Sequence, residues 1–385
     1  MSEACELEHG LACSYLYTAF TLKEDLREGG LNWRQLQMVR KWAAQIYFVA
    51  AEEMLHLAQA WNLLAAIGGT PYYLRPNFPQ SCKYYPFGLP LALEPFGLSA
   101  VQRFIFYELP SEVSPAEQLA MMGIEPIGID GRPYRTVGEL YGHILSGFEA
   151  IPEKDLFLGN PARQVGRELV DFPDIVRVVD RDTARRAITV ITEQGEGTDA
   201  DRTDCHYGVF LTIREELKRE LAEAPFAPAR DTIQDPIAKR RGNYGTDRGS
   251  LIEDPYTREV ALLFDEVYGL MLRMLQYVFS NSTGDPATLL SFSRRAIQIM
   301  PTIILPLGVA LTRLPAGPSY PAKTAGPAFG LTRHVPLPVE PGAASTLVSE
   351  RLAELLTIAQ DLGSRSEAPP QIQRAVAALA ALADI

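Results

Sequence analysis

Cysteine is scarce in this chain of 385 residues, which contains four of them. The four cysteines form no CxxC pair. Thiols that pack or lie incidentally in a fold are typical of a reducing compartment rather than an oxidising one. We therefore expect free cysteines in a reducing compartment.

Positive charge is also in short supply, because 36 Lys and Arg residues stand against 47 Asp and Glu residues. The formal net charge is -11. Binding to a phosphate backbone needs a clustered basic face. The composition therefore argues against a nucleic-acid partner.

Long hydrophobic runs are missing as well. The most apolar run, Ile303–Leu311, has about half the length that spans a bilayer and contains Pro306 and Gly308. Acidic residues follow Met1, where a secretory signal would place basic and then apolar ones. We therefore expect a cytoplasmic protein with no membrane partner.

Motifs for nucleotide binding and for serine hydrolysis are absent too. The sequence contains no GxGxxG, no P-loop and no GxSxG. These motifs build a phosphate-binding turn or the exposed nucleophile of a hydrolase. The chemistry of this chain is therefore to be sought in other residues.

What the sequence does contain is helical periodicity, interrupted by strong stop signals such as Gly68-Gly69. The predicted helices of the first part cover residues 3–22, 32–67, 99–109, 136–151, 183–196 and about 205–222. Asp182 is predicted to cap the fifth of these helices, after a short strand at Val176–Val179. Residues 72–98 are predicted to form a long crossover. After a polar linker at residues 225–255, helices are predicted at 257–281, in two stretches up to 314 and in two terminal segments.

A doubled helix pair indicates the fold class. The interval from Glu8 to Glu53 is similar to that from Glu139 to Glu193, and each joins one helix to the next. Two helix pairs linked by a long crossover build a ferritin-like four-helix bundle. The predicted fold is therefore all-α, with a ferritin-like four-helix bundle and its crossover insertions at residues 1–224. Residues 225–385 are predicted to form a further C-terminal helical region that packs on the bundle or extends it.

Two glutamates and a histidine lie on the inward faces of the first two long helices. Glu8 sits in the middle of an apolar stripe, and Glu53 and His56 stand three residues apart on one face of the second helix. Glu52 lies about 100° round that helix from Glu53. Because an unpaired charge is costly to bury, these side chains make sense if they converge on cations.

The charge balance favours two metal ions. Two divalent ions cancel four carboxylates, and the candidates are Glu8, Glu53, Glu139 and Glu193. Mixed oxygen and imidazole ligands suit iron or manganese better than a structural zinc. We therefore expect two iron ions, with manganese as the alternative metal.

The carboxylates of the two later helices allow more than one interpretation. Glu139 has small neighbours at helical spacing, but its pattern also fits a residue that faces solvent. Glu193 and Glu196 repeat the three-residue spacing, with Glu at the position where a di-metal bundle normally has His. The fourth helix therefore offers no imidazole of its own.

His206 is the candidate for the missing imidazole. It shares an inward stripe with three later apolar residues, so it is either a ligand or a buried core histidine. Gly195 and Gly197 would let the chain bend and return His206 to the site. We expect His206 to be the ligand, with His143 or Glu196 as the alternative.

Four motifs together resemble a known family. They are "ELEHGLACSYLYTAFTLK", "AAEEMLHLAQAWNLLAAIGGTP", "TVGELYGHI" and "ITEQGEG" followed by "CHYGVF". They are similar to the ferritin-like domain of the iminophenylpyruvate dimer synthase family, which includes imine-coupling enzymes of violacein-type and rebeccamycin-type bisindole pathways. The stretch "LPLGVALTRLPAGPSYPAKTAGPAF" also resembles the segment that follows this domain in stand-alone members.

The resemblance implies a ligand set on the matching positions of this chain, namely Glu8, Glu53, His56, Glu139 and the region of EQGEG and His206. One departure matters, because Glu196 occupies the position of the usual histidine in the fourth helix. His206 then supplies the imidazole, or that metal is poor in nitrogen ligands. The bisindole enzymes carry this domain at one end of a longer chain, which leaves the substrate of the present chain open.

The residues and the resemblance together predict a metal-dependent oxidative enzyme of specialised metabolism. It is expected to use dioxygen or peroxide on a small, aromatic or amino-acid-derived substrate. The residues expected to act in catalysis are Glu53, His56 and Glu193. The expected metal ligands are Glu8, Glu53, His56, Glu139, Glu193, Glu196 and His206. Tyr15, Tyr47 and Tyr141 are candidates to line the pocket, with core packing as their alternative role.

Two other functions fit the same residues. One is metal handling or peroxide disposal without an organic substrate. The other is a non-catalytic helical module that binds a partner and keeps a vestigial ligand set. A homo-oligomer is compatible with each of these functions.

Overall fold

The structure is a computed structural model, in which the chain forms two compact units. It describes residues 1–71, 73–80, 89–121, 134–197, 203–223, 225–240, 249–282, 284–331 and 335–383. The first, here called the bundle unit, comprises Met1–Arg75, Gln80–Gln164 and Phe172–Ala229. The second, here called the C-terminal unit, comprises Pro76–Pro79, Val165–Asp171 and Arg230–Ile385. The predicted domain boundary at residue 224 stays a prediction, because a division into compact units does not show that each unit folds on its own.

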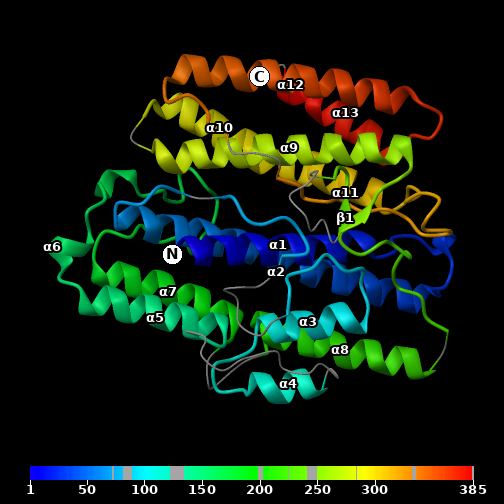
Figure 1. Ribbon diagram of the computed structural model, residues 1–385, viewed down its shortest axis with the longest axis horizontal. Coiled ribbons are helices and arrows are strands. Elements are labelled where there is room, and N and C mark those ends of the chain that lie inside the picture. Colours follow the sequence, from blue (N-terminus) through cyan, green and yellow to red (C-terminus); the bar gives the residue numbers. More distant parts are fainter. Residues whose placement is uncertain are drawn as a thin grey trace. The chain divides into compact units, whose positions relative to one another are not determined.

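The bundle unit is built on a hairpin of two long helices, α1 (Ser2–Thr21) and α2 (Trp33–Ala66). A short 3-10 helix at Leu26–Glu28 lies in the turn between them. Asn32 caps α2 in a reciprocal box with Gln35, which satisfies backbone donors at the start of the helix. The two helices lie side by side (Figure 1), and their facing residues are almost all buried.

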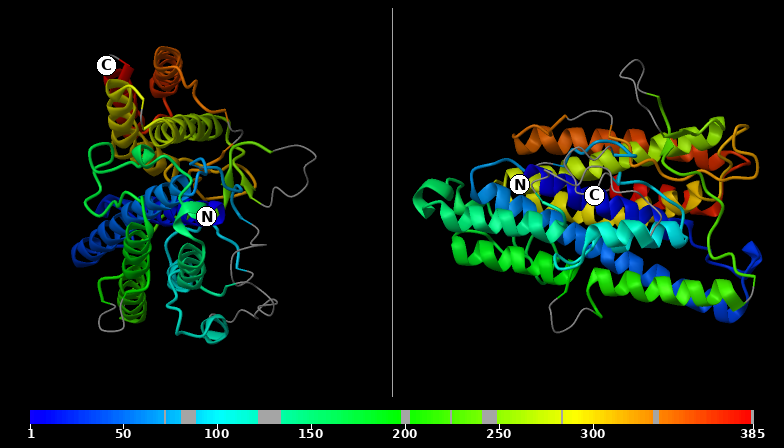
Figure 2. Two further views of the ribbon diagram at one scale, coloured as in Figure 1. Left: turned by 90° about the vertical axis from the view of Figure 1, so that its left-hand side faces the viewer. Right: turned by 60° about the horizontal axis from the view of Figure 1, so that its bottom comes forward.

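The second half of the bundle unit consists of shorter helices. They are α3 (Leu98–Tyr107), α4 (Pro115–Met121), α5 (Val137–Ala150), α6 (Glu153–Leu156), the 3-10 turn Pro161–Arg163, α7 (Arg181–Gly195) and α8 (His206–Glu223). Helix α3 packs on α8 and α5 packs on α7, while α7 and α8 both contact α2. Figures 1 and 2 show α7 and α8 following one another along the hairpin. The third and fourth positions of the bundle are therefore each filled by two shorter helices.

The break between α7 and α8 has a local cause in the sequence. Gly197 follows α7 with a φ of 81°, a left-handed conformation that favours glycine and ends a helix. The connection then runs to Cys205, and residues 198–202 of it lie outside the described part. The chain restarts as a helix at His206, so this side chain stands at the first turn of α8.

The C-terminal unit is also helical. Its elements are the two-residue parallel strands β1 (Pro236–Ile237) and β2 (Ser250–Leu251), followed by α9 (Pro255–Ser280), α10 (Pro286–Ile299), the π-helical segment Met300–Ile304, α11 (Leu305–Leu311), α12 (Pro341–Ser364) and α13 (Pro370–Ala383). Asp254 and Asp285 cap α9 and α10, each directly before a proline at the first helical position. The hairpin of α12 and α13 packs on α9 and α11.

One stretch of the described residues, Pro286–Leu311, is long and apolar enough by length and composition to cross a membrane. It is longer than the run expected from the sequence, because Pro301 and Pro306 stand at the starts of successive helical segments and leave the helix continuous. Within its most apolar window, 56% is buried inside the fold. Buried core helices pass the same test, so the stretch is weak evidence for a membrane span.

The predicted all-α class is confirmed, and so are most of the predicted helices, within one to three residues at their ends. Two local predictions were wrong. The cap of α7 is Asp180 rather than Asp182. Residues 176–179 form no strand, because the backbone of Val176 bonds to side chains of α2 instead, namely Gln59 and Asn62.

Candidate metal centre

Five ionisable side chains meet in the interior of the bundle unit. Each is at most 4% exposed, and they come from α1, α2, the end of α3 and the start of α8. They are Glu8, Glu53, His56, Glu108 and His206. Burying this many ionisable groups demands compensation by pairing, by protonation or by bound cations.

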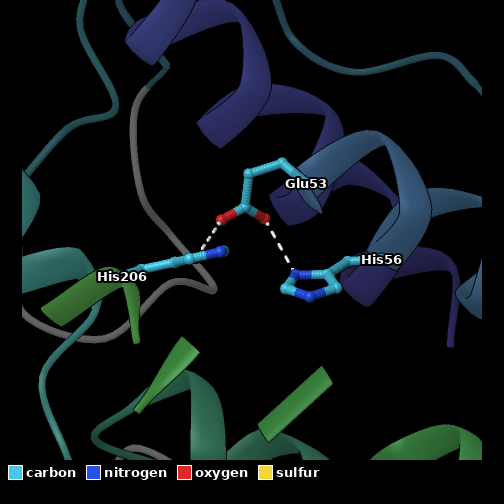
Figure 3. A group of neighbouring side chains, drawn as sticks. All are labelled: Glu53, His56 and His206. Carbon is cyan, nitrogen blue, oxygen red and sulfur yellow. Dashed lines mark hydrogen bonds and ion pairs between the residues drawn. The ribbon is translucent and has the colours of Figure 1, made fainter. Parts of the chain in front are cut away.

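Glu53 lies between the two histidines (Figure 3). Its Oε2 is 3.2 Å from Nδ1 of His56, and its Oε1 is 2.9 Å from Nδ1 of His206. One ligand atom from each of the three residues can be chosen so that all lie within 4.8 Å of one another. The carboxylate is therefore placed to bridge two positions, one beside each ring.

A further carboxylate stands on each side of this bridge. Oε2 of Glu8 is 3.9 Å from Nδ1 of His56, and Oε2 of Glu108 is 3.5 Å from Nδ1 of His206. Glu8, His56 and the Glu53 Oε2 atom are called the Glu8 half-site below. Glu108, His206 and the Glu53 Oε1 atom are called the Glu108 half-site. Each half-site thus offers one imidazole nitrogen, one terminal carboxylate and one oxygen of the bridge.

Two tyrosines orient the terminal carboxylates. The hydroxyl of Tyr141 donates to Oε1 of Glu8, and the hydroxyl of Tyr15 donates to Oε1 of Glu108. A hydrogen bond from a phenol to a buried carboxylate is charge-assisted and therefore strong. The two hydrogen bonds leave the Oε2 atom of each glutamate directed at its histidine.

The outer nitrogen of each histidine is held by an acceptor outside the half-sites. Nε2 of His56 lies 2.9 Å from Oε1 of Gln194, and Nε2 of His206 lies 3.1 Å from Oε2 of Glu52. Since these oxygens can only accept, both Nε2 atoms donate. In the neutral imidazole the lone pair is then on Nδ1, which faces the carboxylates, as in metal-binding histidines.

The donor set fits divalent metal ions. Nδ1 of His206 and Oε1 of Glu53 are 2.9 Å apart, and neither atom has a hydrogen-bond partner in the described residues. A cation between them would satisfy both atoms. Carboxylate oxygens combined with imidazole suit iron or manganese rather than a structural zinc.

Without metal, protons supply the compensation. Burial and the neighbouring Glu53 raise the pKa of Glu8 well above its usual value. Burial and the charge of Glu108 raise the pKa of Glu53 to about 7. Burial alone would lower the pKa of His206, but the charges of Glu53 and Glu108 raise it well above the usual value. Glu108 is the exception: despite its burial, the charge of His206 lowers its pKa.

Three predicted site residues lie elsewhere. Glu139 is partly exposed and pairs with Arg135 at 2.5 Å, because the inward residue of α5 is Tyr141, two positions and about 200° further round the helix. Glu193 is exposed on α7, whose next residue, Gln194, faces the centre instead. The expectation of metal ligands at these two positions is corrected accordingly.

The third is Glu196. Its Oε2 accepts hydrogen bonds from the backbone nitrogen and the hydroxyl of Ser111, at 2.9 and 3.0 Å. Burial raises its pKa. This carboxylate therefore fastens the end of α7 to the segment that follows α3, and the ligand role predicted for it is not supported by its contacts.

Of the two alternatives for the missing imidazole, the structure brings His206 to the centre and leaves His143 exposed on α5. Glu52, predicted to lie off the inward face, is partly buried and reaches His206. The ligand roles of Glu8, Glu53, His56 and His206 stay predictions that metal analysis must test.

Sequence reasoning missed Glu108. The residue follows α3 directly and continues its buried stripe of Val101, Phe104 and Ile105 at spacings of three and four. This is the same signal that identified Glu8 on α1. The signal is weaker here because the helix is short and Pro110 follows closely.

The class of protein follows from the fold and from comparison with known families. The family model described as Ferritin-like matches residues 1–215. The chain belongs to the ferritin-like family.

Two curated relatives refine this assignment. Dichlorochromopyrrolate synthase of Lentzea aerocolonigenes is 29% identical over 361 residues, covering 84% of this chain and 35% of the relative. 2-Imino-3-(indol-3-yl)propanoate dimerase of Chromobacterium violaceum is 28% identical over 357 residues, covering 85% of this chain and 33% of the relative. The chain thus spans about a third of the length of these relatives, and they confirm the resemblance expected from the motifs.

A solved structure shows a likeness too. A ferritin-like protein from Caulobacter vibrioides is 18% identical, with a TM-score of 0.47, and the likeness covers 80% of this chain and 93% of that one.

The corrected ligand set predicts distinct metal contents for two variants. Glu108→Ala should lower the bound metal from about two ions per chain to about one, because one half-site loses its terminal carboxylate. Glu139→Ala should keep both ions. Elemental analysis of protein produced with ample iron and manganese measures this. Equal losses in the two variants would show that the correction is wrong.

The raised pKa values predict how the stability of metal-free protein depends on pH. Glu8, Glu53 and His206 all hold protons more tightly in the folded state. The folded state then binds more protons than the unfolded state, so the free energy of unfolding falls as the pH rises above 6.5 and through about 7. The lowered pKa values of His56 and His9 oppose this fall only at the lower end of the range, because unfolded histidines lose their protons as the pH passes 6.5. The lowered pKa of Glu108 has no effect there, because this group has lost its proton in both states.

The measurement is urea unfolding of chelator-treated protein across that pH range. Manganese-loaded protein is the control, because metal then replaces the protons and should become more stabilising as the pH rises. A free energy of unfolding that is flat or rising with pH in the metal-free protein would contradict the prediction.

Proposed function

We propose that the chain is a metal-dependent oxidative enzyme, in which Glu53 and the residues on either side of it would hold two divalent ions, iron or alternatively manganese. The substrate would be a small aromatic or amino-acid-derived molecule of specialised metabolism. One observation carries the proposal: the carboxylate of Glu53 lies between two Nδ1 atoms, at 3.2 and 2.9 Å, and each belongs to a half-site of matching composition.

The residues that would hold the ions divide evenly. His56 and Glu8 would bind one ion, His206 and Glu108 the other, and Glu53 both. Three carboxylates and two divalent ions leave one positive charge. The carboxylate of Glu52, 3.1 Å from His206, brings the sum to zero. The centre is therefore charge-balanced with four carboxylates, as expected, although two of the four differ from those expected.

The protein's other contribution is to keep the centre dry and fixed. The ring of Tyr15 packs against Phe104 and Phe210, with centroids 4.6 and 5.0 Å apart, beside its hydrogen bond to Glu108. Such a shell excludes water and locks the ligand carboxylates in place. Redox-active metal ions bound there would supply the electron transfer that side chains alone do not.

The relatives support a substrate class. One is named as a dimerase of an imino acid that carries an indole ring. Joining two molecules that each give up one hydrogen atom releases two electrons and two protons. One hydrogen peroxide takes these up and becomes two waters, or one dioxygen takes them up and becomes hydrogen peroxide. Such a reaction fits a centre that exchanges electrons, with the carboxylates and histidines holding the ions.

Several parts of the proposal stay predictions. They are the cytoplasmic location, the homo-oligomer, and the absence of nucleic-acid and membrane partners. They rest on the composition and sequence patterns alone.

The test is consumption of dioxygen or peroxide by iron-loaded protein, with and without the imino acid that an amino-acid oxidase forms from tryptophan or phenylalanine. We expect consumption that depends on the imino acid. Glu53→Ala and His56→Ala should reduce it about 100-fold or more, because each removes a ligand. Glu215→Ala, an exposed position on α8, is the control and should keep the activity.

Other outcomes would point to the two alternative functions. Peroxide consumption without any organic substrate would indicate metal handling or peroxide disposal. Folded protein that binds no metal would indicate a helical partner module.

A further inference from the structure

We propose that the two half-sites are unequal, and that the carboxylate of Glu52 makes the Glu108 half-site the tighter one, which a divalent cation fills first. The inference rests on the proposed function, since it concerns the same centre. It goes beyond it by assigning a role to two residues, Glu52 and Gln194, that are not ligands.

The ligand atoms of the two half-sites match closely. Each has one imidazole Nδ1, one glutamate whose other oxygen accepts from a tyrosine, and one oxygen of Glu53. The two imidazole rings are even nearly parallel, with centroids 5.3 Å apart and an angle of 29° between their planes. A difference in affinity must therefore arise mainly outside the ligand atoms.

The acceptors of the outer histidine nitrogens are what differ. His56 donates to the neutral amide oxygen of Gln194 at 2.9 Å, and His206 donates to the carboxylate of Glu52 at 3.1 Å. A carboxylate is the stronger acceptor, and it makes the imidazole a better metal ligand. It also adds a full negative charge near the ion, which attracts a divalent cation about twice as strongly as a proton at the same distance.

The positions of Glu52 and Gln194 explain why one acceptor can be charged and the other neutral. Glu52 lies on α2 and reaches across to the start of α8, with its side chain 19% exposed. A carboxylate that keeps some contact with water is far less costly than a buried one. Gln194 lies on α7 and reaches across to α2, where a neutral amide holds His56 without adding charge.

Glu52 and Gln194 are thus positioning residues, each acting through one histidine. The consequence is ordered loading. With limiting metal, the protein should hold one ion, at the Glu108 half-site, before the Glu8 half-site fills.

The test is a titration of metal-free, full-length protein with Mn²⁺ at constant pH, followed by calorimetry and by the electron paramagnetic resonance of free Mn²⁺. The wild-type protein should show two steps of distinct affinity. Glu52→Gln should weaken the tighter step by about 10- to 100-fold, the usual effect of losing such a partner. Gln194→Glu should strengthen the weaker step by a similar factor, because it gives His56 the same kind of partner.

Two controls keep the outcome interpretable. Glu215→Gln removes the same charge from an exposed site on α8 and should leave both steps unchanged. His56→Ala should keep the tighter step, and His206→Ala should lose it, which locates the first ion. Circular dichroism of each variant confirms that it is folded.

Three results would overturn the proposal: two equal steps in the wild type, no change in the tighter step of folded Glu52→Gln, or loss of the tighter step in His56→Ala alone. Two unequal steps without any substrate-dependent turnover would refute the oxidative function and leave this inference standing. Absence of Mn²⁺ binding in the wild type would refute both.

Discussion

The bundle unit depends on one electrostatic constraint, the burial of three carboxylates and two imidazoles around Glu53. In an interior without water, burying these groups together is costly unless positive charge compensates the carboxylates. Protons can supply it, and the raised pKa values of Glu8 and His206 show where they would reside. Two divalent ions would also supply it, and the Glu53 Oε1 and His206 Nδ1 atoms, which have no hydrogen-bond partner in the described residues, would then gain one.

The breaks in two of the four helical positions of the bundle bring residues at helix ends to this centre. Four continuous helices would present side chains only from helix interiors. Here Glu108 follows the last turn of α3 and His206 begins α8, so both reach the interior from helix ends. Helices α1 and α2 of the opposing hairpin are unbroken and carry the candidate ligands Glu8, Glu53 and His56. One half of the bundle thus contributes residues from within continuous helices, and the other contributes residues at helix ends.

This division also explains what could be predicted from the sequence. Glu8, Glu53 and His56 sit in long helices, where periodicity fixes the inward face, and their burial follows the pattern. Glu139 and Glu193 were misplaced because a shift of one or two residues in a short helix turns a side chain by about 100° or 200°. Tyr141 and Gln194 face the centre in their place. The phase of such helices is set by packing between α5 and α7, which sequence spacing alone does not determine.

The central claim is that Glu53 bridges two ions, each held by one of the two histidines. Diffraction from crystals of manganese-loaded protein, with anomalous maps collected at the manganese edge, tests it most directly. The account predicts two anomalous peaks about 3.5 to 4 Å apart, one within bonding distance of His56 and the other of His206. A single peak bound by both histidines, or peaks beside Glu139 or Glu193, would contradict it.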